Sequence, residues 1–101
     1  MEISKSTNGT LLIVSVSGKL DSNTAVAFEK ELDNILATEM FNNLEINMEE
    51  LTYLSSAGLR VLLKIQKKLM SLEAGIVITN VNENIKSVFE ITGFLGILNI
   101  I

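Results

Sequence analysis

Segments with the pattern of strands and segments with the pattern of helices alternate along this chain. Residues 10–18 are rich in β-branched side chains, and Leu12, Val14 and Val16 alternate along one face, which is typical of a strand. Residues from about 23 to 37 instead repeat their apolar side chains at the spacing of an amphipathic helix. Because this alternation is typical of layered α/β proteins, we expect an open mixed β-sheet, largely parallel, with helices packed on it.

The other segments continue the alternation. Apolar and polar side chains alternate over residues 43–48, and a helix beginning at Ser56 is expected to run to about Met70. A later, short helix that carries Phe89 should end at Gly93. The expected strands, about five in number, are residues 1–5, 10–18, 43–48, 76–79 and 97–101.

The expected helix from Ser56 has an apolar face and a basic stripe. Its positive side chains recur at positions i, i+4, i+7 and i+8, which lie on one helix face, and they hold half of the positive charge of the chain. These residues are Arg60, Lys64, Lys67 and Lys68. The apolar positions, which we expect to face the sheet, are Leu59, Leu62, Leu63, Leu69 and Met70, widened by Val61, Ile65 and Leu72.

Composition limits the possible functions. A chain of 101 residues, 48% of them hydrophobic, is expected to form a single domain over residues 1–101. It contains no cysteine and no histidine, which removes thiol nucleophiles, disulfides and zinc-ligand clusters. The net charge of -4 argues against nucleic-acid binding. Because no signal-peptide core and no apolar run of membrane length occur, we expect a cytoplasmic protein with no membrane insertion.

Two adjacent hydroxyls, on Ser55 and Ser56, lie where the central helix should begin. Serine caps helices by accepting a hydrogen bond from an unpaired N–H group, so capping is one interpretation. A nucleophile is a second, but the chain has no histidine to act as the usual base, and Leu54 and Tyr53 stand where a nucleophile elbow needs glycine. A third is a phosphorylation switch, because a helix N-terminus tolerates a phosphate.

Other kinds of chemistry lack their residues. No glycine-rich phosphate-binding motif occurs, and acidic pairs such as Glu49-Glu50 are better explained as a solvated turn than as a metal site. We therefore expect no enzyme, with no catalytic residue, no metal site and no cofactor.

Three stretches of the chain carry a family resemblance. They are Ser55-Ser-Ala-Gly-Leu-Arg60, with the strand and connector before it, Gly18-Lys-Leu-Asp21, and Phe89-Glu-Ile-Thr-Gly-Phe94. They resemble the phosphorylation loop, the first loop after the long strand and the end of the third helix of STAS domains, and in particular of the small stand-alone anti-sigma factor antagonists of bacteria. The resemblance covers nearly the whole chain.

This resemblance implies a function and a site. The phosphorylated serine would be the one two positions before the glycine, which is Ser56, with Ser55 as the alternative. The unmodified protein would bind an anti-sigma factor that is also a serine kinase, releasing a sigma factor, and phosphorylation would end the interaction; a serine phosphatase is a further candidate partner. The implied partner-binding residues are Asp21, Ser55, Ser56, Ala57, Gly58 and Arg60.

The chain also departs from the family pattern. Many members have Asp at the end of the strand and Asp directly before the phosphorylated serine, where this chain has Asn47 and Ser55. Many continue into a final helix after the last strand, so we expect thin cover of the sheet there, or cover from a partner. The alternative function is a STAS module that is not phosphorylated and acts as a structural or regulatory partner in a transporter or lipid-transport assembly.

Overall fold

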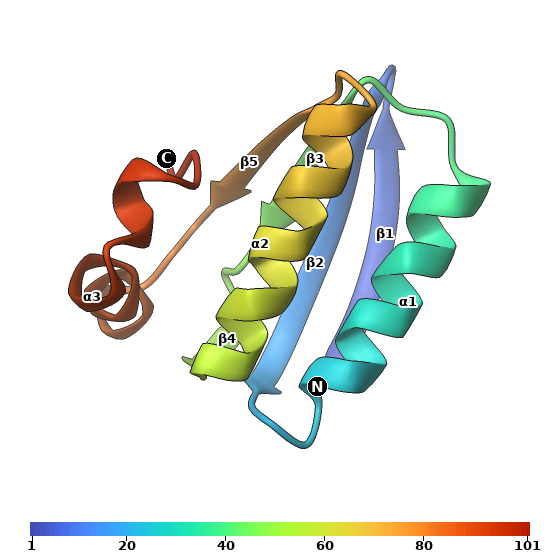
Figure 1. Cartoon of the computed structure of the whole chain (residues 1–101). Helices are drawn as coiled ribbons and strands as arrows, with labels where there is room; N and C mark the ends of the chain where they lie inside the picture. Colours follow the sequence, from blue (N-terminus) through green and yellow to red (C-terminus); the bar gives the residue numbers. More distant parts are fainter.

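Two helices cover one face of a five-stranded mixed sheet (Figure 1). This computed structural model describes residues 1–94 and 96–101. The strands are β1 (Glu2–Asn8), β2 (Leu11–Leu20), β3 (Asn43–Asn47), β4 (Leu51–Leu54) and β5 (Gly75–Thr79). The helices are α1 (Ala25–Thr38), α2 (Ser56–Ser71) and α3 (Glu83–Thr92), followed by the short 3-10 helix η1 (Phe94–Gly96).

Strand β2 connects the whole sheet. It pairs antiparallel with β1 and parallel with β3, which in turn pairs parallel with β5. Near its end β2 also pairs parallel with β4, after a shift of register between Gly18 and Lys19. Gly18 has a φ of 86°, a left-handed conformation that favours glycine, and its N–H donates to the carbonyl of Glu50 at 3.0 Å. This shift brings the carboxyl ends of β2 and β4 together.

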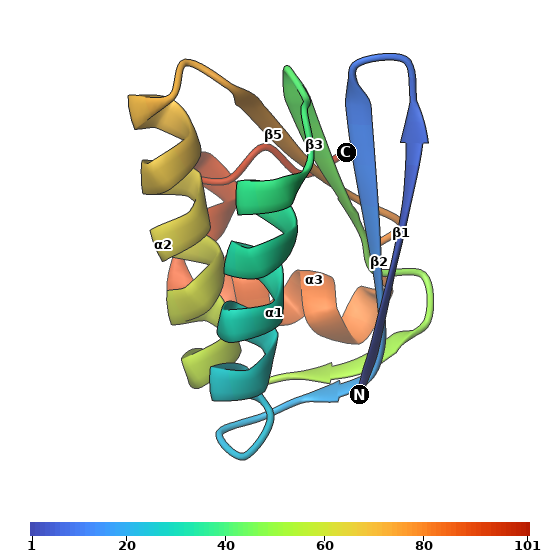
Figure 2. The same ribbon diagram turned by 90° about the vertical axis from the view of Figure 1, so that its right-hand side faces the viewer.

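Most of the core lies between the sheet and the helices α1 and α2, which Figure 2 shows on one side of the sheet, and α3 adds Ile85 and Phe89. Every second residue of β2 and β3 faces the helices, because side chains alternate along a strand. The largest fully buried side chains are Phe28, Phe89, Leu12, Leu20, Leu32, Leu44, Ile46, Met48, Leu51, Leu59, Leu62 and Ile65.

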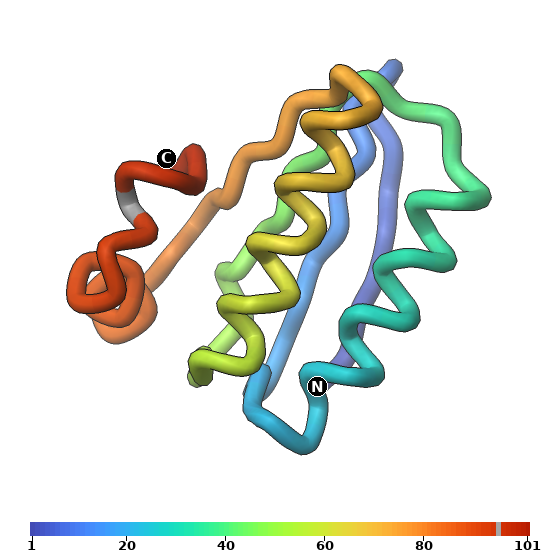
Figure 3. The backbone as a smooth tube through the Cα atoms, viewed as in Figure 1, coloured from blue at the N-terminus to red at the C-terminus, as the bar shows by residue number. Residues whose placement is uncertain are grey.

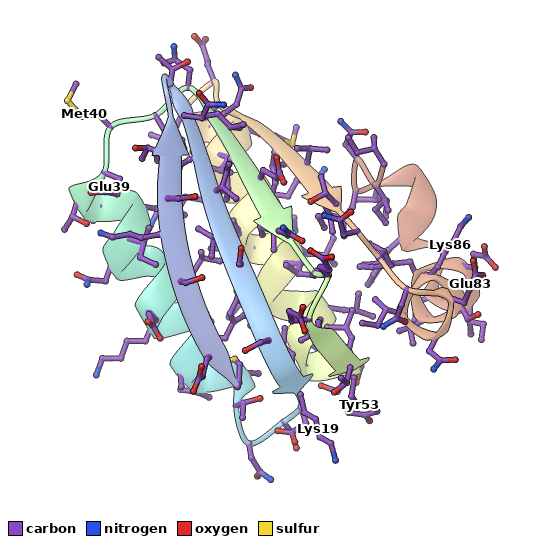
Figure 4. The ribbon with its side chains drawn as sticks, turned by 180° about the vertical axis from the view of Figure 1, so that it is seen from behind. Lys19, Glu39, Met40, Tyr53, Glu83 and Lys86 are labelled. Atoms are coloured by element: carbon purple, nitrogen blue, oxygen red, sulfur yellow. The ribbon has the colours of Figure 1, made fainter. Side chains whose placement is uncertain are left out.

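The other face of the sheet is mostly polar, and no helix of the described part of the chain covers it in Figure 4. Ser15 stands between Ser4 on β1 and Asn47 on β3, its partners in the strand register. The hydroxyl of Thr79 on β5 donates to the carboxylate of Glu45 at 2.9 Å. Short polar side chains of this kind allow the face to be exposed to water.

The α/β class and the mixed sheet of five strands are confirmed, but the strand expected over residues 97–101 is wrong. That segment makes one isolated bridge to β5, between Ile100 and Ile78, and its backbone path is seen in Figure 3. The chain enters η1 after Gly93, and the side chain of Gln66 donates to the carbonyl of Ile97 at 2.6 Å. The fifth strand is instead β4, in a segment for which no strand was expected.

The expected helices are present, but two expected core positions of α2 are wrong. Leu59 and Leu62 are buried as expected, whereas the side chains of Met70 and Leu72 are 67% and 60% exposed. The helix ends at Ser71, and Leu69 is its last buried residue.

Candidate functional site

The two adjacent serines lie at the start of α2, beside the carboxyl ends of β2 and β4 (Figure 1). Ser55 is the N-cap residue, and its Oγ accepts a hydrogen bond from the N–H of Gly58 at 3.3 Å. Its own N–H donates to the carbonyl of Leu20, the last residue of β2, at 2.9 Å. Ser56 is the first residue of the helix and is exposed. The capping interpretation therefore applies to Ser55, and the hydroxyl of Ser56 faces solvent.

Gly58 sets how closely the first turn of α2 packs on the strands. An added Cβ at this position would lie 2.8 Å from side-chain carbons of Leu20 and Leu54, closer than real Cβ contacts allow. Gly58 is accordingly buried. The start of α2 thus contacts the ends of β2 and β4 directly, with no side chain at residue 58 between them.

Asp21 follows β2 directly and organises the turn that leads to α1. Its Oδ1 accepts hydrogen bonds from the N–H groups of Asn23 and Thr24 at 2.9 and 3.0 Å, and from the Thr24 hydroxyl at 3.2 Å. These bonds, chiefly the one from the Thr24 N–H, lower the pKa of the Asp21 carboxyl below its ordinary value, and the positive charge of Lys19 adds to this effect. The carboxylate is therefore negatively charged at neutral pH and is engaged with its own turn.

Two ion pairs connect the basic stripe of α2 to α1. Lys64 Nζ lies 3.3 Å from a carboxylate oxygen of Glu29, and Lys68 Nζ lies 3.4 Å from one of Asp33. These pairs were not predicted, because nothing local in the sequence indicates that the two helices lie side by side. Arg60, on the same face of α2, is exposed and forms no ion pair with any described residue.

The residues singled out from the sequence differ in their surroundings. Asp21 and Ser55 lie next to each other in space, because the Ser55 N–H bonds to the residue before Asp21. Ser56 and Arg60 are exposed on the first turns of α2, whereas Ala57 is half-buried. Gly58 is buried, which gives it a packing role.

Sequence reasoning missed two residues beside this site. Lys19 and Tyr53 are partners in the register of β2 and β4, and Figure 4 shows both at that end of the sheet. The Tyr53 side chain is 50% exposed. An exposed aromatic ring is a common anchor in protein interfaces. Recognising β4 as a strand would therefore have indicated Tyr53 as a candidate binding residue.

The chemistry at this end of the molecule is that of charged and hydroxyl groups on a surface. A hollow of about 190 Å³ lies elsewhere, on the polar face of the sheet, and is lined in part by Ser4, Ser15 and Asn47. Across residues 1–94 and 96–101, the structure holds no cluster of acidic residues suited to a metal ion. Nor is any of the helices in these ranges long and apolar enough to span a membrane.

A family model and a related protein both place the chain in one family. Residues 2–101 match the family described as the STAS domain. The proposed anti-sigma factor antagonist BtrV of Bordetella bronchiseptica is 33% identical over 87 residues, which cover 86% of this chain and 74% of that protein.

Solved structures agree in their fold. An anti-sigma factor antagonist from Mycobacterium paratuberculosis has a TM-score of 0.87 at 24% identity, with 98% of this chain and 83% of that chain covered. The anti-sigma factor antagonist SpoIIAA in its unphosphorylated form has a TM-score of 0.81 at 14% identity, with 99% of this chain and 88% of that chain covered. The Bacillus cell fate determinant SpoIIAA in the phosphorylated form has a TM-score of 0.72 at 14% identity, with 99% and 91% covered.

Proposed function

Because the chain belongs to the STAS domain family, we propose that it is an anti-sigma factor antagonist whose binding is switched by phosphorylation of Ser56. In its unmodified form it binds an anti-sigma factor that is also a serine kinase, and a sigma factor is released. It acts by binding and catalyses no reaction itself. A serine phosphatase would reverse the modification, and a kinase that uses ATP places these events in the cytoplasm.

The observation that carries this proposal is the different engagement of the two serines. The hydroxyl of Ser55 accepts the capping hydrogen bond from Gly58, while Ser56 is exposed at the first position of α2. A kinase would transfer the γ-phosphoryl group of ATP to the Ser56 Oγ: the bond to the β-phosphate breaks, a P–O bond to Oγ forms, ADP leaves, and the hydroxyl proton passes to a base of the kinase. The alternative acceptor, Ser55, would have to give up its cap.

Charge explains why such a phosphate would affect binding more than folding. A phosphoserine adds about -1.5 to -2 charges at neutral pH, and a helix N-terminus accommodates negative charge. In a desolvated interface the same charge loses its water, and an unpaired buried charge commonly costs about 3–5 kcal/mol. Since about 1.4 kcal/mol is a factor of ten in affinity, the modified protein should bind at least 100-fold more weakly.

The partner-binding surface of this proposal surrounds Ser56. It comprises Asp21 at the end of β2 and the start of α2, with Arg60 supplying a positive charge one helical turn beyond Ser56. The proposed residues are Asp21, Ser55, Ser56, Ala57, Gly58 and Arg60, of which Gly58 acts by letting the helix pack closely.

The test begins with partners captured from the native cytoplasm and identified by mass spectrometry. A captured kinase is then incubated with this protein and ATP, the modified residue is located by peptide mass spectrometry, and the affinity of each form is measured by titration calorimetry. Ser56→Ala should bind constitutively and resist phosphorylation, and Ser56→Asp should fold normally and bind poorly. Ser55→Ala is the matched control, because it removes the neighbouring hydroxyl and leaves Ser56.

Two outcomes would change the proposal. Phosphate found on Ser55 instead of Ser56 would move the site. Unchanged affinity after full modification of Ser56 would overturn the switch and favour a STAS module that works without phosphorylation.

A further inference from the structure

The ion pairs between α1 and α2 follow a fixed register. The two helices run in the same direction along the sheet, as Figure 1 shows. Glu29 pairs with Lys64, and Asp33 pairs with Lys68, so in both pairs the acid on α1 precedes the base on α2 by 35 residues. Residues four apart in a helix lie on one face, so this register extends toward the start of both helices.

When this register is extended by one helical turn, Arg60 has no acidic residue opposite it on α1. Arg60 precedes Lys64 by one helical turn, and the residue of α1 at the same offset is Ala25, followed by Val26. Ala25 is buried and Val26 is exposed, and neither carries charge. Among the residues that the structure describes, the basic stripe therefore has one guanidinium at the Ser56 end that is not used to hold α1 and α2 together.

The charged groups around Ser56 favour an anion at this position. Asp21 is the nearby acid, and its Oδ1 already accepts three hydrogen bonds within its own turn. Lys19 lies beside Asp21 and attracts its carboxylate. Glu29, on α1, is paired with Lys64. Arg60, four residues after Ser56 on the same face of α2, is thus placed to pair with a phosphate on Ser56.

We propose that Arg60 is the internal counter-ion of a phosphate on Ser56, so that phosphorylation withdraws its guanidinium from the partner-binding surface. This proposal rests on the proposed function, since it takes Ser56 as the modified residue. Side chains at i and i+4 have Cβ atoms about 5–6 Å apart, and a guanidinium pairs with a phosphate through two parallel hydrogen bonds. Phosphorylation then adds a negative charge to the surface and removes a positive one.

The test needs no partner protein. Phosphoserine is incorporated at residue 56 during translation, and the second pKa of the phosphate is measured by a phosphorus NMR titration, while the Arg60 Nε–H resonance is followed in the same samples. The same titration is made with Arg60→Gln and with the control Lys67→Gln, which removes an equal charge from an exposed position of the same helix, further from Ser56.

Arg60→Gln should raise the second pKa of the phosphate by roughly 0.3 units or more, because loss of a cation disfavours the dianion. Lys67→Gln should raise it by much less, and the Arg60 resonance should shift in parallel with the phosphate titration. Equal shifts for the two variants, or an Arg60 resonance that does not respond, would overturn the pairing. The proposed switch would survive that result, whereas a failed binding test would leave the pairing intact, so the two failures are distinguishable.

Discussion

The Oγ of Ser55 lies 3.3 Å from the amide nitrogen of Gly58 and accepts its hydrogen bond. The two adjacent serines therefore differ in role: Ser55 caps the helix, and Ser56 is exposed. The N-cap hydroxyl satisfies an N–H group that has no partner within the helix. Ser56, at the next position, makes no side-chain hydrogen bond to any described residue.

This separation predicts unequal costs for two alanine substitutions. Ser55→Ala should lower the free energy of unfolding by about 1 kcal/mol, because it removes the cap. Ser56→Ala should change it by no more than about 0.5 kcal/mol, as is usual for an exposed position. Urea denaturation followed by circular dichroism measures both. Equal losses would show that Ser56 contributes to the cap as well.

Gly58→Ala should destabilise the protein even though alanine favours helices. The new methyl group would lie 2.8 Å from carbons of Leu20 and Leu54, and overpacking of this kind costs about 1–3 kcal/mol. The control is Gly96→Ala, where no heavy atom lies within 4 Å of the added Cβ. The two variants are compared by thermal and urea unfolding. A Gly58→Ala protein as stable as the wild type would mean that α2 can move away from the strands at little cost.

The inner and outer faces of α2 should respond differently to truncation. Leu62 is fully buried, and Leu62→Ala should cost about 2–5 kcal/mol. Met70, which its spacing predicts on the same apolar face, is 67% exposed, and Met70→Ala should cost no more than about 0.5 kcal/mol. Urea titrations measure the free energy of unfolding of both variants. A large loss of stability for Met70→Ala would mean that Met70 packs in the core.

The turn at Asp21 should make stability depend on pH in one direction. Hydrogen bonds lower the pKa of its carboxyl in the folded state, while the unfolded value is about 3.9. The stabilisation is therefore fully present above about pH 4 and is lost as the pH falls through the lower, folded pKa. The difference in unfolding free energy between the wild type and Asp21→Asn should shrink on acidification. A difference that stays constant between neutral and acidic pH would contradict this.

Much of the fold could be predicted because the strands and helices have clear periodicity. In β2 and β3 the buried face requires an apolar side chain at every second residue. In α1 and α2 the buried face requires apolar side chains at helical spacing, so both patterns can be read from the sequence. The start of α2 at Ser56 could be predicted for the same reason, with a cap residue before it.

The errors come from contacts between distant segments. β4 has only four residues and buries Leu51 and Leu54 with two exposed residues between them, so it lacks the alternation that identifies a strand. Residues 97–101 have the composition of a strand, but after Gly93 and η1 they pair with β5 through one isolated bridge, at Ile78. The ion pairs between α1 and α2 depend on how the helices lie on the sheet, which no local pattern contains.

The close packing of Gly58 also bears on how fast a partner can bind. Because the first turn of α2 rests directly on Leu20 and Leu54, packing holds the backbone beside Ser56 in place before any partner binds. Complex formation then requires no ordering of this segment, and association rates are set by diffusion and orientation. Under the proposed function, a phosphate on Ser56 would therefore act through its charge at this surface and not by ordering or disordering the segment.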